Sequence, residues 1–561
     1  MRFSSHSRAG ALLSLTVLLT LVGAFFTYST LGNHAVHAAA AAASFKGTAG
    51  VIKVAGTTDP MHLAPGKASK RVARVAPLRT IAKGVGPNNV SRPVTNSSRL
   101  AAARLLHSFD GVNELQNAAA SNTPLEPPDE GLGVGNGYVF NIVNVTGAIY
   151  RTDGTGVTGP FSATSFFAEP ANAFLSDPRT FYDKATNTWF ATILEINFTT
   201  GSESHIDIAV NPSGNPTTPW TVYRIDATDP TGAGCPCFPD YPIFGIDQYN
   251  VYVSAQEFPI TGAGNGNGAE IYAVSKAQLE ALKPANNVRF GSLSIAGQLA
   301  YHVQPAISYG NPAAEYFMDS LDPNSTFDNR LGVWALTNRQ AVTTGIGLPN
   351  LSSTVIASEA YGFPVNAQTP PGFNSYSNAA TTGLVQSDFD AMQEVEYING
   401  HLVGALNTSV TIPGDTGTRD GVAWFQVAPK LSGAVISGST RVTQQGYVSV
   451  QGEYLLYPHI NQSADGTTAM TFSLGGPNTY LSAAYAVKGA GSANFGSVQI
   501  AGAGVAPDNG FTGVGGAGRW GDYSAGQLDP NSNNIWFATQ YIPNNGDQFA
   551  NWGNRVFEVG A

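Results

Sequence analysis

Short runs of alternating apolar and polar residues, separated by turn residues, follow one another along the chain from about residue 107. The repeat is clearest in 177–191 and 522–538, which both begin with Asp and end in Trp-Phe-Ala after an Asn-containing turn. Similar strand–turn–strand stretches recur about seven times after residue 125, at intervals of roughly 45–70 residues. Repeats made only of strands and turns predict β-sheets arranged around an axis, as in a β-propeller.

We therefore expect an all-β protein with a β-propeller of seven blades over residues 106–561. The spacing is irregular, so six or eight blades stay open, and a two-sheet sandwich is the structural alternative. The last strand pattern, 554–558, lies directly before the end of the sequence. A ring of sheets needs closure, so we expect residues 108–110, or the strands of the first blade, to pair beside the C-terminal blade.

The N-terminal region has the features of an export signal followed by a linker. Two arginines precede an apolar run over 9–26, and a Val-His-Ala stretch at 36–38 offers a small-residue cleavage site. This order is typical of a signal peptide, to which we assign 1–38. The alternative is an uncleaved membrane anchor, for which the run is short. Residues 39–105 predict a mostly disordered basic linker or pro-region, rich in Ala, Pro and Gly.

Charge differs between the two parts of the chain. Residues 1–105 hold 13 Lys or Arg and one acid, and the remainder holds 15 Lys or Arg and 37 acids, giving the net charge of −10. A basic arm can dock on the acidic body, a cell-wall polymer or a membrane surface, or it can simply be a spacer. The acidic body repels phosphates, which argues against nucleic acid as partner. No later segment is apolar enough to cross a membrane, so we expect a secreted or cell-surface monomer.

The chain has two cysteines, Cys235 and Cys237, separated by one proline. Two thiols without a nearby histidine do not make a zinc site. A disulfide suits an extracellular protein, although the ring is small, and two free thiols are the alternative. We expect a local clip rather than redox catalysis.

Polar residues stand at the start of the first strand in the predicted repeats. They are Asp129, Asp177, Asp240, Gln304, Gln393, His459 (or Tyr457) and Asp522. The innermost strand of a propeller blade lines the central channel, so these side chains are expected to converge on one face. Converging carboxylates attract Ca²⁺, a cationic ligand or sugar hydroxyls. They also raise one another's pKa, as acid/base catalysis requires.

A purely structural role is the simpler alternative for these acids. An Asp at the start of a strand often accepts hydrogen bonds from backbone N–H groups of a neighbouring loop. The loops 322–328 and 529–534 also carry oxygen ligands, but Asx-turns account for both, and neither has the spacing of a helix-loop-helix calcium site. We therefore expect no cofactor, with Ca²⁺ left open.

Other chemistry has little support in the sequence. It contains no Gly-x-Ser-x-Gly elbow, no His-Glu-x-x-His zinc pair and no phosphate-binding glycine loop. The tryptophans inside strand patterns are expected in the core. Trp220, Trp520 and Trp552 lie near loop ends and are the candidates for stacking on a sugar.

Segments 235–247, 269–276 and 519–525 resemble a family of secreted bacterial β-propeller proteins, and so does the motif Asp177-Pro-Arg179 with its following Tyr-Asp and Trp-Phe pairs. The resemblance spans about residues 107–561 and implies the propeller fold and secretion. This family is uncharacterised and adds no catalytic assignment. Arg179 enters the candidate ligand-binding set with this motif. Members are distantly similar to sialidases, but this chain lacks the Ser-x-Asp-x-Gly-x-Thr-Trp boxes and the Arg-Ile-Pro start of sialidases.

Three functions agree with these patterns. The first is a non-catalytic secreted propeller that binds an extracellular ligand, expected to be carbohydrate such as a polysaccharide or cell-wall polymer, on the face bearing Asp177, Asp240 and Asp522. The second is a glycoside hydrolase or lyase that uses two of those carboxylates, which requires carboxyl oxygens about 5–10 Å apart beside an open cleft. The third is a structural or adhesive surface protein displayed by its basic arm.

Overall fold

The computed structural model describes residues 43–63, 74–75, 90–95, 104–122, 124–197, 203–230, 235–260, 266–321, 327–374, 379–380, 382–514, 516–544 and 550–560. Strands make up 56% and helices 6%, so the protein is all-β, as expected. The predicted signal peptide, 1–38, lies outside the described residues. Within them, no helix has the length and apolar character needed to span a membrane.

The chain forms successive units of four antiparallel strands, each named here by its first strand. The units in the first half are these: β6 (Gly131–Gly135), β7 (Tyr138–Val143), β8 (Thr146–Arg151) and β9 (Phe161–Ser162); β10 (Phe174–Asp183), β11 (Thr188–Asn197), β12 (Glu203–Asn211) and β13 (Trp220–Asp226); β14 (Cys237–Ile246), β15 (Asn250–Pro259), β16 (Gly268–Ser275) and β17 (Ala285–Phe290); β20 (Gln304–Ser308), β21 (Glu315–Ser320), β22 (Phe327–Thr337) and β23 (Asn350–Gly362). Each strand pairs with the next along the sequence, as a meander does.

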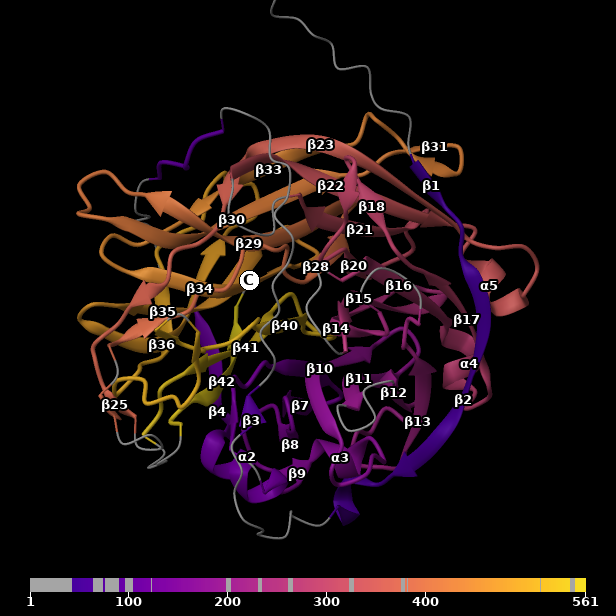
Figure 1. Ribbon diagram of the computed structural model, residues 1–561, viewed down its shortest axis with the longest axis horizontal. Coiled ribbons are helices and arrows are strands. Elements are labelled where there is room, and N and C mark those ends of the chain that lie inside the picture. Colours follow the sequence, from indigo (N-terminus) through magenta and orange to yellow (C-terminus); the bar gives the residue numbers. More distant parts are fainter. Residues whose placement is uncertain are drawn as a thin grey trace, which may run out of the picture. The chain divides into compact units, whose positions relative to one another are not determined.

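The second half continues the pattern. Its units are β28 (Val395–Ile398), β29 (His401–Thr411), β30 (Thr418–Ala428) and β33 (Arg441–Val448); β34 (Tyr454–Gln462), β35 (Thr468–Gly476), β36 (Thr479–Lys488) and β37 (Gln499–Gly502); β40 (Ala525–Leu528), β41 (Ile535–Tyr541), β42 (Gly553–Val559) and β4 (Leu105–Asn113). The first strands of the units surround the centre of Figure 1. Two neighbouring pairs of them, β14 with β20 and β20 with β28, are also joined by parallel pairing. This order around an axis is that of a propeller-like fold.

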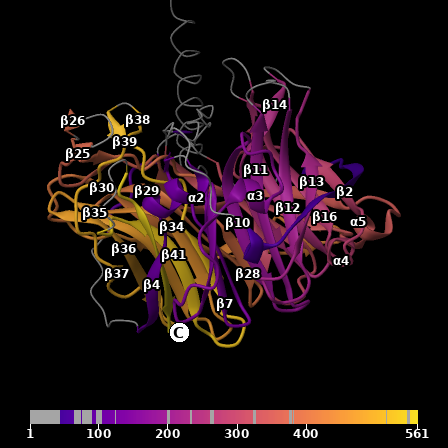
Figure 2. The same cartoon turned by 90° about the horizontal axis from the view of Figure 1, so that it is seen from below.

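Short elements connect the units. The minor strands are β3 (Arg74–Val75), β5 (Leu125–Glu126), β18 (Ser294–Ile295), β19 (Gln298–Leu299), β24 (Ala367–Gln368), β25 (Phe373–Asn374), β26 (Ala379–Ala380), β27 (Leu384–Val385), β31 (Leu431–Ser432), β32 (Val435–Ile436), β38 (Gly513–Val514) and β39 (Ala517–Gly518). The helices are η1 (Pro60–His62), α2 (Glu114–Ser121), α3 (Ala163–Phe166), α4 (Lys276–Glu280) and α5 (Gln340–Thr344). In Figure 2 the small sheets β25–β26 and β38–β39 lie on the same side as one end of β14, and the C-terminus lies on the other.

The ring is closed by an N-terminal strand, and this prediction is confirmed. β4 pairs antiparallel with β42, with Ser108 opposite Phe557 and Asp110 opposite Arg555. Arg555 also donates to the Asp110 carboxylate at 2.6 Å. The C-terminal unit is therefore built from both ends of the propeller-like region, which holds the first and last units together.

Part of the predicted linker is strand, not disordered chain. β1 (Ala43–Phe45) pairs with β23, while β2 (Thr48–Thr58) pairs with β13 through one half and with β17 through the other. Figure 1 shows β2 along the outer edge of these units. Most β2 side chains are exposed, with Ile52 and Thr58 buried. Backbone hydrogen bonds to free sheet edges hold this segment, and such pairing leaves little hydrophobic pattern for a sequence to display.

Side chains of the first strands alternate between the two neighbouring interfaces. In β10, Phe181 packs with Phe244 of β14 at 5.8 Å between ring centroids, whereas Tyr182 packs with Trp189 at 5.0 Å in a different cluster. Successive residues of a strand point to opposite faces, so each apolar strand fills two interfaces at once. The core is therefore a series of layers between sheets, which positions the polar starts of the first strands around the axis.

Candidate functional site

A one-residue bulge recurs near the start of three first strands. It lies between Ser176 and Arg179 in β10, between Asp240 and Ile243 in β14, and between Leu456 and His459 in β34. Each bulge contains a residue followed by proline, and that residue has a left-handed backbone: φ is 58° at Asp177, 56° at Tyr241 and 54° at Tyr457. Proline lacks the N–H that a regular ladder would use, which favours a bulge there.

This shared bulge aligns the repeats in a way the sequence did not show. Asp177, Tyr241 and Tyr457 occupy equivalent positions, whereas Asp240 is equivalent to Ser176. The expectation that Asp240 joins the other acids is therefore wrong by one residue. Because a shift by one residue turns a side chain to the other face of a strand, Tyr241 takes the central place instead.

The structure does bring three of the predicted acids together. Asp129, Asp177 and Asp522, named here the acidic triad, each offer a carboxylate oxygen within 4.8 Å of the others. They come from the start of the β6 unit, from β10 and from the segment before β40. Residues 393 positions apart in sequence thus meet at the axis, as the propeller hypothesis required.

Hydrogen bonds show that two of these carboxylates tie units together. Asp129 accepts from the Asp522 amide at 2.8 Å and from the Asn144 side chain at 2.6 Å. Asp177 accepts from the amide of Tyr241 at 3.2 Å. The Tyr241 hydroxyl in turn donates to the Asp522 carbonyl at 3.0 Å. These bonds match the structural alternative, in which the acids satisfy backbone amides of neighbouring strands.

Burial raises the pKa of carboxyl groups in and near this triad. Desolvation, followed by the nearby charges of Asp522 and Asp177, raises the pKa of Asp129 well above its ordinary value. Desolvation and Asp522 raise the pKa of Asp177 to about 6. Desolvation and Asp522 also raise the pKa of Asp388, which lies in the loop before β28. Burial and mutual repulsion therefore oppose the simultaneous ionisation of these acids.

Two buried arginines compensate the remaining negative charge. Arg519 donates to the Asp522 carboxylate at 2.8 Å. Arg179 lies with its guanidinium carbon 3.2 Å from the ring centre of Tyr523 and 5.7 Å from that of Tyr241. The Arg179 side chain is buried, yet Nε and Nη1 have no hydrogen-bond partner among the described residues. A buried guanidinium with unpaired N–H groups is costly unless water or a ligand meets it.

Glu394 is a member of this site that the sequence analysis missed. Burial raises its pKa to about 7, and the positive charge of Arg179 limits the rise. His459 Nδ1 lies 3.7 Å from the Glu394 carboxylate, but burial and Arg179 lower the pKa of His459 to about 3. The imidazole is therefore neutral at pH 7, and the contact is not an ion pair. The adjacent Gln393 offered the only sequence signal for this position.

The other predicted polar residues are also buried. The Gln393 oxygen lies 3.0 Å from the Tyr241 hydroxyl and shares its hydrogen with the Asp522 carbonyl. Gln304 in β20 is fully buried, and neither its side-chain oxygen nor its nitrogen has a hydrogen-bond partner in the described part of the chain. Arg179, Gln304 and His459 Nδ1 are thus polar groups of three first strands whose hydrogen bonds to protein are incomplete.

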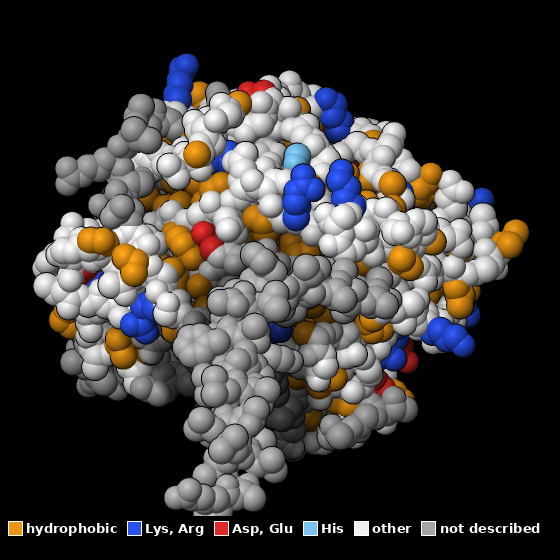
Figure 3. Space-filling view, turned by 90° about the horizontal axis from the view of Figure 1, so that it is seen from above, with side chains coloured by type: hydrophobic (Ala, Val, Ile, Leu, Met, Phe, Trp, Pro, Cys, Tyr) orange, Lys and Arg blue, Asp and Glu red, His pale blue; other side chains and the backbone are white. Residues whose placement is uncertain are grey.

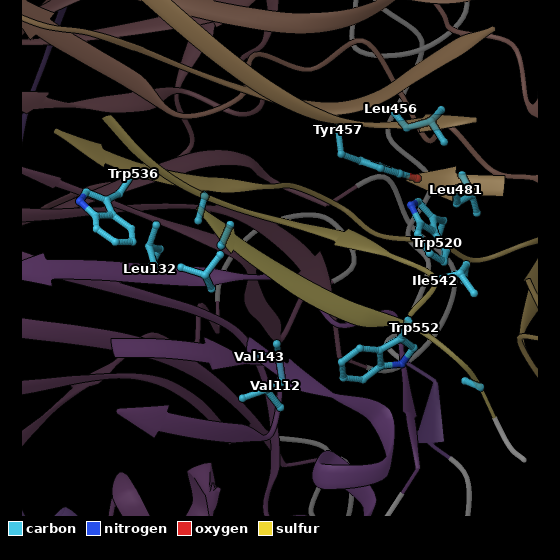
Figure 4. Packing of buried hydrophobic residues seen from close by; sticks show 14 of the residues in the cluster. Val112, Leu132, Val143, Leu456, Tyr457, Leu481, Trp520, Trp536, Ile542 and Trp552 are labelled. Carbon is cyan, nitrogen blue, oxygen red and sulfur yellow. The ribbon is translucent and has the colours of Figure 1, made fainter. Parts of the chain in front are cut away.

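The tryptophan candidates are core residues, which corrects their assignment as sugar platforms. Trp220, Trp520 and Trp552 are at most 2% exposed. Figure 4 shows Trp520 beside Tyr457 and Leu481, within the same buried cluster as Trp552. Tryptophans near loop ends were expected to face solvent, but Trp220 packs against Phe140 and Phe166, and Trp552 donates to the Leu125 carbonyl at 2.9 Å. No face of these rings is left for stacking.

Among the residues that the structure describes, two clusters have the residue types to hold a metal ion. One is the acidic triad, and the other is Glu169, His205 and Asp207 at the β10 unit. In the second cluster Arg224 donates to Glu169 and, at 3.1 Å, to Asp207. An arginine therefore already neutralises carboxylates of this cluster, as Arg519 does for Asp522 of the triad.

Cys235 and Cys237 are joined by a disulfide, with Cα atoms 4.4 Å apart. The pair lies at the start of β14, and no residue of the acidic triad belongs to that strand. The bridge joins residues two positions apart and leaves no free cysteine among the described residues. It is therefore a local clip in the backbone.

The visible face in Figure 3 carries isolated charged side chains among white and apolar atoms. Charged residues amount to 12% of the chain, and those of the polar site are largely buried. The negative net charge therefore does not by itself identify the site, whereas the buried groups around the axis do.

No known protein family matches the sequence, and no curated protein does either. Among solved structures, similarity extends to a protein of unknown function from Dyadobacter fermentans, with 12% identity over 68% of this chain and 94% of that one and a TM-score of 0.32. The haemagglutinin-neuraminidase ectodomain of parainfluenza virus 5 shows 9% identity over 66% and 80%, with a TM-score of 0.34. An α-L-arabinanase from Cellvibrio cellulosa shows 11% identity over 66% and 95%, with a TM-score of 0.28.

Similarities at this level carry no functional assignment. The class of the protein rests on its own strand order, which is that of an all-β, propeller-like protein with a polar site at the starts of its first strands.

Proposed function

We propose that this protein is a secreted, seven-bladed propeller that binds an extracellular carbohydrate at the polar centre formed by the starts of its first strands. The observation that carries the proposal is the set of buried polar groups with incomplete hydrogen bonding, Arg179, Gln304 and His459. Buried polar atoms are almost always paired, so groups left without protein partners mark a place for water or ligand.

The chemistry of the centre suits a polyhydroxylated ligand. Arg179 supplies donors, Glu394 and the Oδ1 of Asp522, unpaired within the described residues, supply acceptors, and the rings of Tyr241 and Tyr523 flank the guanidinium. Sugar hydroxyls both donate and accept, so a site with groups of both kinds matches them better than it matches a simple anion. A Ca²⁺ ion on the triad would offer coordination positions that sugar hydroxyls can fill.

The hydrolase alternative has less support from this geometry. Paired catalytic carboxylates need about 5–10 Å between them and a cleft that admits the substrate. The triad oxygens lie within 4.8 Å, and Asp129 and Asp177 are occupied by backbone amides of neighbouring strands. Asp129 and Asp177 are therefore not free to act as a catalytic acid/base pair.

A carbohydrate array, probed with and without Ca²⁺, tests this function. The Gln304→Leu variant replaces a buried amide whose polar atoms have no partner, so its fold should be retained while saccharide binding weakens at least tenfold. Arg179→Leu should weaken it similarly, whereas the exposed Arg441→Leu should bind as wild type does. If the wild type binds no saccharide with or without Ca²⁺, or if both centre variants bind saccharide as wild type does, the proposal is wrong.

The export signal and the extracellular location belong to the same proposal. Expression of the full chain in a bacterial host, followed by N-terminal sequencing of protein from the culture medium, should give a start near residue 39. Retention of the whole chain in the membrane fraction would favour the uncleaved anchor instead.

A further inference from the structure

A separate cavity of about 570 Å³ lies at the opposite ends of the first strands. It is named here the turn-side pocket, and its walls come from segments 181–185, 246–248, 308–311 and 527–533, with single residues from elsewhere. Asp177 of the triad and Asp183 of the pocket are both in β10, and six residues of strand separate them by about 20 Å. The pocket and the triad are therefore distinct sites.

The inner wall of the turn-side pocket is apolar. Phe181 and Ile246 are buried side chains of first strands, and Tyr309 packs against the same cluster. Leu528 lies at the end of β40 and is half-buried. Apolar and aromatic walls that converge from several units are typical of small-molecule sites, and the volume is within the usual range for them.

The wall is also held rigid by a single side chain. Gln527 accepts from the Val134 amide at 2.9 Å, and its nitrogen donates to the carbonyls of Val134 and Tyr182, both at 3.0 Å. These bonds join β6, β10 and β40 at the edge of the pocket. A pocket whose wall is fixed in this way needs little rearrangement to accept a ligand.

Every charged group at the pocket has a protein partner. Lys276 Nζ lies 2.6 Å from the Asp183 carboxylate, Arg339 pairs with Asp247, and Lys184 donates to the Pro530 carbonyl. Asp529 accepts from the amide of Asn531 at 2.8 Å and from the Ser532 hydroxyl at 3.1 Å. The positive charges of Lys184, Lys276 and Arg339 equal in number the carboxylates of Asp183, Asp247 and Asp529. Neither an anion nor a cation is therefore attracted on balance, while either would lose its hydration, so the pocket favours a neutral molecule.

The rim adds a few polar contacts. Gln248, Asn311 and Asn533 line the opening, and Asn311 and Asn533 are exposed to solvent. Carboxamides both donate and accept hydrogen bonds, so they match hydroxyl or carbonyl groups at the outer end of a ligand.

We propose that the turn-side pocket binds a neutral, largely apolar small molecule, an aromatic compound whose few hydroxyl or carbonyl groups face the rim. This site is independent of the carbohydrate function proposed above. It lies at the other end of the axis, and its chemistry is apolar where that of the triad is polar.

Titration of the full mature chain with N-phenyl-1-naphthylamine, a neutral fluorophore that brightens in apolar surroundings, tests the proposal. We expect saturable binding of one probe per chain. The anionic 1-anilinonaphthalene-8-sulfonate should bind at least tenfold more weakly. Ser532→Trp places an indole at the opening without removing a core contact and should weaken binding at least tenfold. Asn531→Trp, on the same exposed turn but outside the lining, should bind as wild type does.

The outcomes separate this proposal from the previous one. Arg179→Leu should leave naphthylamine binding unchanged, and Ser532→Trp should leave saccharide binding unchanged. Absence of saturable naphthylamine binding, equal affinity for the anionic probe, or equal effects of the Ser532 and Asn531 variants would each overturn the proposed pocket ligand.

Discussion

The two ends of the first strands use charge in opposite ways. At the start of the strands, the acidic triad, Arg179 and Arg519 are buried and crowded, and each group depends on its neighbours. At the far end, the buried charges of the turn-side pocket form separate pairs, Lys276 with Asp183 and Arg339 with Asp247, and an apolar wall lies beside them. The same strand, β10, contributes to both. Position along the axis, rather than residue type, therefore decides whether an aspartate links units or borders a pocket.

Among the substitutions that test this comparison, the one at Asp129 is expected to change the free energy of unfolding most. Asp129→Ala leaves the Asp522 amide and the Asn144 side chain without their acceptor in a buried place. We expect a loss of about 3 kcal/mol in the free energy of unfolding, measured by urea denaturation. Asp153→Ala, which removes an acid from an exposed hairpin turn, serves as the control and should leave the midpoint unchanged. Equal behaviour of the two variants would contradict the linking role of the triad.

An intermediate effect should appear in the pH dependence. Burial raises the pKa of Glu394 to about 7, above its ordinary value of 4.5. The folded state therefore favours the protonated carboxyl. Its contribution to the free energy of unfolding is fully present below pH 4.5 and is lost as the pH rises through 7. Between pH 5 and pH 8 the loss amounts to about 2 kcal/mol.

Glu394→Gln sharpens that observation, because glutamine cannot ionise. Urea denaturation at several pH values should show a flatter profile between pH 5 and pH 8 for this variant than for wild type. Glu203→Gln, at an exposed position, should retain the wild-type profile. If Glu394→Gln keeps the full pH dependence, the axial carboxyl is not buried as described.

The smallest effect is expected at the turn-side pocket. Lys276→Met removes the partner of Asp183, but that carboxylate still accepts from the Ala185 amide and the Thr186 hydroxyl, both at 2.9 Å. We expect a loss of about 1 kcal/mol in the free energy of unfolding, less than for Asp129→Ala, because these two donors still compensate the buried carboxylate. Binding of N-phenyl-1-naphthylamine should stay within twofold of wild type. A loss as large as that of the triad variant would remove the contrast between the two ends.

Much of the fold could be predicted from local pattern alone. Alternation of apolar and polar residues located the strand repeats, and the strand pattern at the very end of the sequence led to the closure by β4 and β42. Both predictions rest on properties that a short stretch carries in its own residues. The β2 strand was not predicted, because it pairs through its backbone and most of its side chains are exposed.

The candidate site was predictable only in part. Asp129, Asp177 and Asp522 were found from their places at the starts of repeats, whereas Asp240 was aligned one residue away from Tyr241. A bulge changes which side chain reaches the axis, and its position follows from how proline disrupts the pairing of two strands. Glu394 was not predicted, because its neighbour Gln393 is the polar residue that the pattern places at the start of that repeat.

The amino-acid sequence by itself determined that this chain forms repeated strands, since side-chain alternation acts within a few residues. Only the tertiary structure decided which groups meet, because strands from distant parts of the chain enclose them. That enclosure buries Trp520, leaves Arg179 with unmet hydrogen bonds, and raises the pKa of Glu394. Burial and proximity belong to the assembled ring of sheets, and no single repeat contains them.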